Sequence, residues 1–100
     1  MSNGMIWRED LDALQFAAEN GGNCIVHRRA FRAMLRNPPM QHDCIEFYEQ
    51  NAAAFEAAAK AKIDNGDVHE ASNFHLNSRQ IRNSLTVLGL AAILHDQFGE

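Results

Sequence analysis

The hydrophobic period of the chain changes within one short segment, residues 23–36, and this change limits the possible folds most. Residues 23–27 form a short apolar run with adjacent β-branched side chains, which is typical of a strand. The residues that follow are apolar at helical spacing, at Phe31, Met34 and Leu35. A strand that passes directly into an amphipathic helix indicates a mixed fold, with helices packed against a sheet.

Turn-forming residues bound this segment on both sides. Asn20-Gly21-Gly22 is a hairpin signal, so we expect a strand over 14–18 to be joined to the strand over 23–27. Asn37-Pro38-Pro39 ends the helix, because a residue that precedes proline avoids the α region. The first third of the chain is therefore expected to be a hairpin followed by a helix over 28–36.

The middle of the chain is dominated by alanine. The run NAAAFEAAAKAK at 51–62 has strong helix propensity and favours one long helix over 43–63. Asn65-Gly66 is expected to end that helix, because glycine readily adopts the left-handed conformation of a C-terminal cap.

The last third carries one more strand and one more helix. A third strand is expected within 68–77, and Ser78 is expected to cap a helix over 79–97. The expected fold is a single α+β domain over residues 1–100, in the order β-β-α-α-β-α, with a short antiparallel sheet packed by helices.

Composition narrows the class of protein. With 46% hydrophobic and 22% charged residues among 100, the chain can bury one core without disulfides or metal. The net charge of -4 argues against a general nucleic-acid binder, which would be basic. Two cysteines and an N-terminus without the features of a signal peptide predict a cytoplasmic protein. The most apolar run, 85–94, is about half the length of a membrane span, so no membrane partner is expected.

The last helix is apolar around most of its circumference. Such a helix must be buried on all sides or covered by another subunit, and full burial is hard to arrange in a domain of this size. We therefore favour a homodimer contact over packing within one chain. The candidate interface residues are Leu85, Leu88, Leu90, Ala92 and Ile93. Gly89 would permit a partner helix to approach closely.

The helix over 28–36 carries four arginines, and two interpretations of them stay open. Arg28, Arg29, Arg32 and Arg36 form a candidate surface for an anion or a partner, because guanidinium groups at helical spacing can follow a phosphate backbone. The second interpretation is a solvated face that pairs with the acidic residues of the segment 43–56. We favour the second, because the net charge is negative and nucleic acid is an unlikely partner.

Motifs for catalysis or metal binding are weak. Cys24-x-x-His27 and His42-x-Cys44 supply ligand types that zinc accepts, but residues 24 and 27 of one strand point to opposite faces. No nucleophile motif or phosphate loop is present in the sequence. The expectation is a protein without catalytic residues, metal or cofactor.

The order of these features resembles a family of small bacterial proteins, the domain of unknown function fourteen eighty-eight. The resemblance covers residues 12–78 and runs from an aromatic strand and a glycine turn, through a short R-x-A-hydrophobic helix, to an alanine-rich helix and a final strand. The matching positions are Phe16, Gly22, Cys24, Val26, Arg29, Ala30, Phe55, Lys62 and Leu76. The resemblance implies a small α+β domain and carries no functional residue with it.

The expected function is therefore macromolecular interaction or regulation without catalysis, by a homodimer with an unknown protein partner. An inhibitor carried by a mobile element would have the same small size and acidic charge. Two alternatives belong to other classes. One is a nucleic-acid-binding module that uses the arginines of 28–36. The other is a binder of a small apolar ligand in a cavity between sheet and helices, lined by Trp7, Phe16, Phe31 and Phe55.

Overall fold

The computed structural model describes the backbone of residues 4–35 and 38–98, and the side chains of these residues up to position 89. The described elements are four strands and four helices. They are β1 (Ile6–Arg8), β2 (Ala13–Ala17), β3 (Asn23–His27), α1 (Arg28–Met34), α2 (Gln41–Gln50), α3 (Ala52–Asp64), β4 (Phe74–His75) and α4 (Ser78–Phe98).

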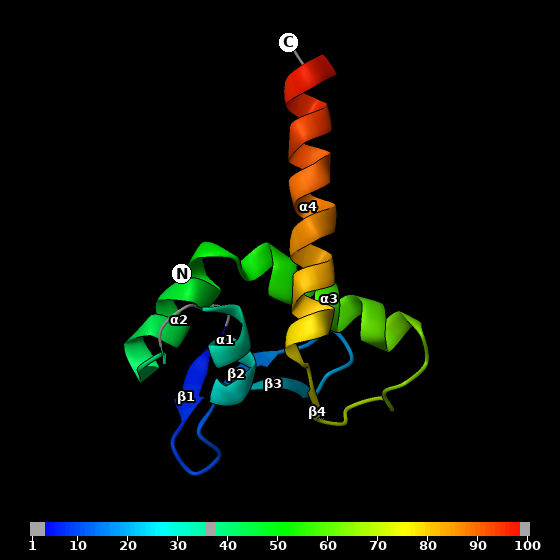
Figure 1. Cartoon of the computed structure of the whole chain (residues 1–100). Coiled ribbons are helices and arrows are strands. Elements are labelled where there is room, and N and C mark those ends of the chain that lie inside the picture. The colour runs from blue at the N-terminus through cyan, green and yellow to red at the C-terminus, as the bar shows by residue number, and fades with distance from the viewer. Residues whose placement is uncertain (1–3, 36–37, 99–100) are drawn as a thin grey trace.

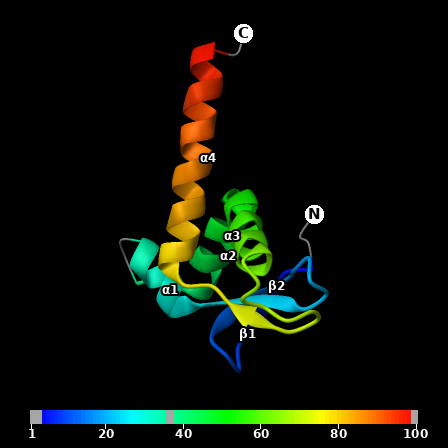
Figure 2. The same cartoon turned by 90° about the vertical axis from the view of Figure 1, so that its right-hand side faces the viewer.

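The strands form one sheet in the order β1-β2-β3-β4. The pairs β1–β2 and β2–β3 are antiparallel, whereas β4 runs parallel to β3, with Cys24 opposite Phe74. Figures 1 and 2 show α2, α3 and α4 on one side of the sheet, so the fold has two layers. The other face of the sheet carries no helix in the described part of the chain.

The core lies between the sheet and the helices. Alternate residues of β2 and β3 point into it, as the two-residue period of a strand requires. Helices α1, α2 and α3 add four aromatic rings, of which Phe55 is fully buried and lies 5.2 Å from the ring of Tyr48. The largest fully buried side chains are Tyr48, Phe16, Phe31, Phe55, Leu14, Ile81, Val26, Cys24 and Cys44.

The predicted α+β class is confirmed, but two details of the predicted sheet are wrong. The chain has a further strand, β1, whose three residues are too few to show a period in the sequence. The sheet is mixed rather than antiparallel, because three helices separate β3 from β4 and bring the chain back in the same direction. The strand expected within 68–77 is limited to Phe74–His75.

The long helix expected over 43–63 is two helices that meet at Asn51. The backbone of Asn51 leaves the helical region, at φ -129° and ψ 28°, and its side-chain Nδ2 donates to the carbonyl of Phe47. Asparagine competes for backbone hydrogen bonds in this way, which is why it interrupts helices. The break is not evident from the sequence, because the alanine-rich run that follows Asn51 has high helix propensity.

The hairpin turn at Asn20-Gly21-Gly22 holds the loop before β4. The Nδ2 of Asn20 donates to the carbonyls of His69 and Ser72, at 2.9 and 3.0 Å, and the carbonyl of Asn20 accepts from the amide of Ala71 at 2.7 Å. A Cβ at Gly22 would lie 2.6 Å from the carbonyl carbon of Ser72, which is too close for ordinary contact. The loop therefore packs against the turn at a distance that only glycine permits.

Helix α4 begins against the other helices and continues beyond them. Its capping residue is Asn77 rather than the predicted Ser78, since the amide of Gln80 donates to Asn77 Oδ1 and the amide of Asn77 donates to Gln80 Oε1. Ile81 is fully buried, and Arg82 donates to the carbonyl of Ala33 in α1. None of the helices in the described part of the chain combines enough length with enough apolar character to pass through a lipid bilayer.

Candidate functional site

Two parallel strands end side by side, and each is followed closely by a helix. β3 ends at His27 and α1 begins at the next residue, while β4 ends at His75 and α4 begins at Ser78. The register pairs Ile25 with His75, so His27 lies two residues further along the same face of the sheet. This arrangement brings together two histidines that are 48 positions apart in the sequence.

The two imidazole rings stack. Their centroids are 4.9 Å apart and their planes differ by 8°. The Nδ1 of His27 is 3.3 Å from the carbonyl oxygen of Leu11, and the Nε2 of His27 forms no hydrogen bond with a described residue. The Nζ of Lys62 in α3 donates to the carbonyl of His75 at 2.7 Å, so an ammonium group lies beside the pair.

An open cavity of about 450 Å³ surrounds these groups. The α1 side of the cavity supplies Arg29, Ala30 and Ala33, and the start of α4 supplies Ser78 and Gln80. No carboxylate is found among the described residues that line it. We call this space the histidine cavity, and its lining residues are His27, Arg29, Ala30, Ala33, Lys62, His75, Leu76, Asn77, Ser78 and Gln80.

The environment of His75 disfavours its protonated form. Partial burial lowers the pKa of His75 below its ordinary value, and the nearby His27 and Lys62 lower it further by charge repulsion. The same cationic neighbours would attract an anion that entered the cavity.

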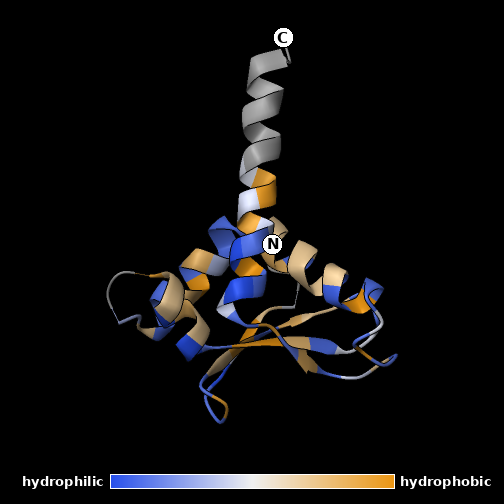
Figure 3. Cartoon of the chain, turned by 45° about the vertical axis from the view of Figure 1, so that its right-hand side comes forward, coloured by the Kyte–Doolittle hydropathy of each residue, from blue (hydrophilic) through white to orange (hydrophobic). Residues whose placement is uncertain are grey.

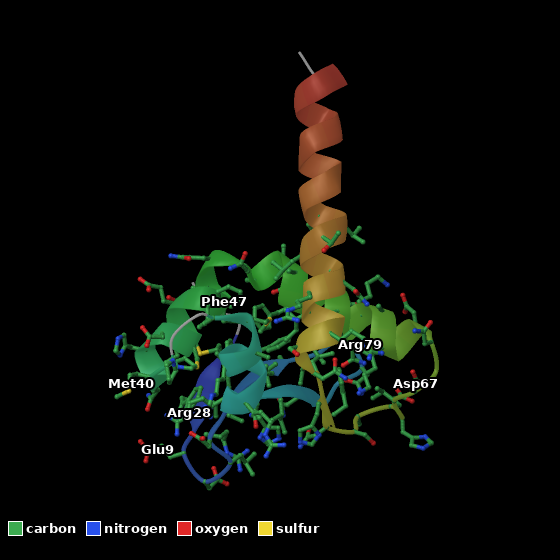
Figure 4. The ribbon with its side chains drawn as sticks, in the orientation of Figure 1. Glu9, Arg28, Met40, Phe47, Asp67 and Arg79 are labelled. Atoms are coloured by element: carbon green, nitrogen blue, oxygen red, sulfur yellow. The ribbon has the colours of Figure 1, made fainter. Side chains whose placement is uncertain are left out.

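The predicted arginine surface is only partly assembled. Arg28 Nε forms an ion pair with Asp12 Oδ2 at 3.0 Å, in the loop between β1 and β2, so its partner is not one of the acids of 43–56. Arg29 and Arg32 are exposed and form no ion pair with a described residue. Figure 4 shows Arg28 at the lower end of α1, near that loop. Arg36 lies outside the described residues.

Three arginines of α1 line a second concavity of about 380 Å³. Its lining residues are Asp12, Arg28, Arg29, Arg32, Pro38 and Pro39. The carboxylate of Asp12 neutralises part of this surface through its pair with Arg28. Arg29 belongs to both concavities and connects this one to the histidine cavity.

The apolar surface of α4 lies where the helix leaves the domain. Leu85 is half-buried against the core, whereas 64% of Val87 and 39% of Leu88 are exposed. Figure 3 shows apolar residues on α4 at the level where it passes the other helices, and Figures 1 and 2 show its backbone projecting beyond them. The side chains of the other predicted interface residues, Leu90, Ala92 and Ile93, lie outside the described part of the structure.

The cysteines are buried side chains of the core. Burial raises the pKa of the Cys24 thiol to about 12 and that of the Cys44 thiol to about 11. Cys24 points into the core while His27 lies on the other face of the sheet, as the strand period predicts. Among the described residues, no group of three or more histidine, cysteine, aspartate or glutamate side chains is placed to hold a metal ion.

The rings expected to line an apolar cavity instead pack against one another. Phe55 lies 6.4 Å from Phe16 and 5.8 Å from Phe31, measured between ring centroids, and all three rings are at most 1% exposed. Trp7 packs at the border of this cluster. These four residues therefore belong to the core and its edge.

Sequence reasoning missed the pairing of His27 with His75. The alternation of β3 places His27 on the outer face of the sheet, but only the parallel register of β4 brings the second ring to it. Comparison of the chain with protein-family models, with curated proteins and with solved structures gives no match. The resemblance to the family of unknown function therefore stays a prediction.

Proposed function

We propose that the protein is a non-catalytic interaction protein of the cytoplasm that forms a homodimer through α4. The observation that carries this proposal is the position of α4, whose first half packs on the domain and whose second half continues past it. The proposal includes binding of a further macromolecule by the dimer.

The projecting half of α4 needs a partner surface. From position 86 to Phe98 it has 13 residues, and isolated helices shorter than about 12–15 residues are marginal in water. Residues 87–94 read VLGLAAIL, which leaves no polar side chain in two turns. A contact that covers this segment would both remove apolar surface from water and hold the helix.

A second copy of the same chain is the occupant that fits best. Ile81, Leu85, Leu88 and Ala92 follow one another at spacings of four, three and four, which is the spacing of a coiled-coil seam. Ile81 and Leu85 use this seam to pack within the chain, and the seam continues in the same register where the domain ends. Two such helices would contact each other about a two-fold axis, with the same residues on both sides.

Neither Cys24 nor Cys44 is activated as a nucleophile. At neutral pH a thiol with a pKa of about 11 or 12 is almost entirely protonated, and the thiolate is the reactive form. Cys24 and Cys44 are also fully buried, so a substrate would not reach them in the folded protein.

The molar mass of the full chain in solution tests the proposal. Sedimentation equilibrium should give twice 11.2 kDa at micromolar concentration. Leu88→Glu should convert the protein to monomer, because it places a charge at a seam position that is exposed in the single chain. Ala57→Glu, which adds the same charge at an exposed position of α3, should leave the dimer intact. A wild-type protein that stays monomeric at all concentrations would refute the homodimer.

A further inference from the structure

We propose that the histidine cavity binds the phosphate group of a small phosphorylated molecule. This inference is independent of the homodimer proposed above, because the cavity lies at the ends of β3 and β4 and the apolar half of α4 lies beyond them.

The charges that line the cavity have one sign. Arg29 contributes a guanidinium group from α1, and Lys62 contributes an ammonium group from α3. His27 and His75 contribute imidazoles from β3 and β4, and the start of α4 adds only uncharged polar side chains to the lining. The described lining contains no carboxylate to neutralise these groups, so a dianion would gain charge-assisted hydrogen bonds that no protein group now provides.

The contacts already made leave donors available. Lys62 uses one of its three N–H bonds on the carbonyl of His75, and His27 uses its Nδ1 on the carbonyl of Leu11. These bonds hold the two side chains in place, and the remaining N–H groups of Lys62 stay open to a ligand. The amide of Gln80 at the start of α4 is not needed as a donor to the ligand, because it already donates to Asn77 Oδ1.

The size and walls of the cavity indicate a small organic phosphate rather than a bare ion. Its volume of about 450 Å³ lies within the range of ligand pockets, roughly 300–1,000 Å³. Ala30, Ala33 and Leu76 provide an apolar wall next to the cationic groups. A phosphate monoester with a compact apolar or planar body matches this combination, and adenosine monophosphate is a suitable probe.

The lowered pKa of His75 supports this assignment. Its causes are partial burial and then the charges of His27 and Lys62, and a bound dianion would offset the repulsion. Protonation of His75 would strengthen anion binding, so affinity should rise as the pH falls from about 8 to about 6. Sulfate is the probe for this test, because it remains a dianion throughout this range. The charged and titratable groups that share the cavity lining with His75 are His27, Lys62 and Arg29.

Proton NMR of the imidazole rings during titration of the full-length wild-type protein provides the first experiment. Inorganic phosphate and adenosine monophosphate should shift the ring signals of His27 and His75. Those of His42 and His69, which are exposed and outside the cavity, should not move and serve as internal controls. Adenosine without its phosphate should shift none of them. Equal movement of all four signals would show non-specific ion binding and overturn the proposal.

Charge-removing variants in α3 provide the second experiment. Lys62→Gln should weaken adenosine monophosphate binding at least roughly tenfold, which corresponds to the loss of one charge-assisted hydrogen bond. Lys60→Gln is the matched control, since Lys60 lies on the same helix but pairs with Asp64 outside the cavity, and it should change the affinity less than about twofold. Amide spectra of both variants verify that they are folded. Equal weakening by the two variants would contradict the proposal.

A short single-stranded oligonucleotide distinguishes the two sources of a phosphate group. The proposal expects it to bind no more tightly per phosphate than adenosine monophosphate. If the oligonucleotide shifts His27 and His75 while adenosine monophosphate and inorganic phosphate do not, the cavity recognises a nucleic-acid backbone and the small-molecule assignment is wrong.

Discussion

Replacement of Gly22 by alanine should destabilise the protein more than replacement of any other glycine in the described chain. The backbone of Gly22 is not in the left-handed region, so alanine costs no conformational strain there. The cost is steric, because the new Cβ would meet the carbonyl carbon of Ser72 at 2.6 Å. The neighbour is backbone, which cannot rotate away as a side chain can, and the loop must move by about 1 Å to reach ordinary contact distance.

A displacement of that size would break the bonds that hold the loop to the turn. They are the two bonds from Asn20 Nδ2 to the carbonyls of His69 and Ser72, the bond between the amide of Ala71 and the carbonyl of Asn20, and the bond from the amide of Asn23 to Asn73 Oδ1. Each such bond contributes about 0.5–1.5 kcal/mol net. Loss of most of them predicts a decrease of about 2–4 kcal/mol in the free energy of unfolding, which is a large fraction of the roughly 5–15 kcal/mol of a typical domain.

Urea unfolding at fixed protein concentration measures this decrease, with Gly66→Ala as the control. Gly66 has a φ of +79° and free space around its Cβ position, so alanine there should cost only the left-handed strain, about 1–2 kcal/mol. Exchange of the Leu76 amide, which bonds to the carbonyl of Ile25, should also accelerate in Gly22→Ala, because β4 follows the loop directly. A Gly22→Ala variant as stable as Gly66→Ala would refute the steric argument.

Four further outcomes follow from the same contacts. Gly89→Leu should weaken the dimer roughly tenfold or more if α4 is the interface. An added Cβ at Gly89 meets nothing within 4 Å in the single chain, so the effect would come from the partner helix. An unchanged dissociation constant would exclude Gly89 from the contact. Tyr48→Phe should leave the free energy of unfolding unchanged or raise it by about 1 kcal/mol, because the buried hydroxyl has no hydrogen-bond partner among the described residues, and a clear loss by urea unfolding would show that a partner exists. Iodoacetamide at about pH 8 should label Cys24 and Cys44 only after unfolding, since their raised pKa values keep them protonated, and rapid labelling of the native protein would contradict their burial. Fluorescence anisotropy should detect no salt-sensitive DNA binding, that is, no binding that weakens steeply between about 50 and 200 mM salt. If such binding is found and Arg32→Gln reduces it, the arginines form a nucleic-acid surface.

The sequence alone determined the local elements whose signal lies within a few neighbouring residues. The alternation of residues 23–27, the glycine turn before them and the apolar spacing from Phe31 to Leu35 placed a hairpin and a helix where the structure has β2, β3 and α1. The sequence also predicted that Cys24 and His27 face opposite ways, because the period of a strand fixes this without any tertiary contact. The extent of the last helix was predicted within one residue at each end.

Signals that depend on a single residue or on very short segments were less informative. The break at Asn51 lies inside a run of strong helix formers, and propensity summed over that run outweighs one asparagine. β1 has three residues and is too short to show alternation, and β4 is limited to two residues of the segment 68–77 in which the sequence predicted a strand. Both strands exist because neighbouring strands supply hydrogen bonds to them.

Only the tertiary structure decided the features on which the proposals rest. The parallel register of β4 against β3 brings His75 to His27, and α3 returns to place Lys62 beside them. The partner of Arg28 is Asp12 in a distant loop rather than an acid of the next helix. These contacts join residues between 13 and 48 positions apart, and a local pattern cannot specify them, because they arise from the way the whole chain closes its core.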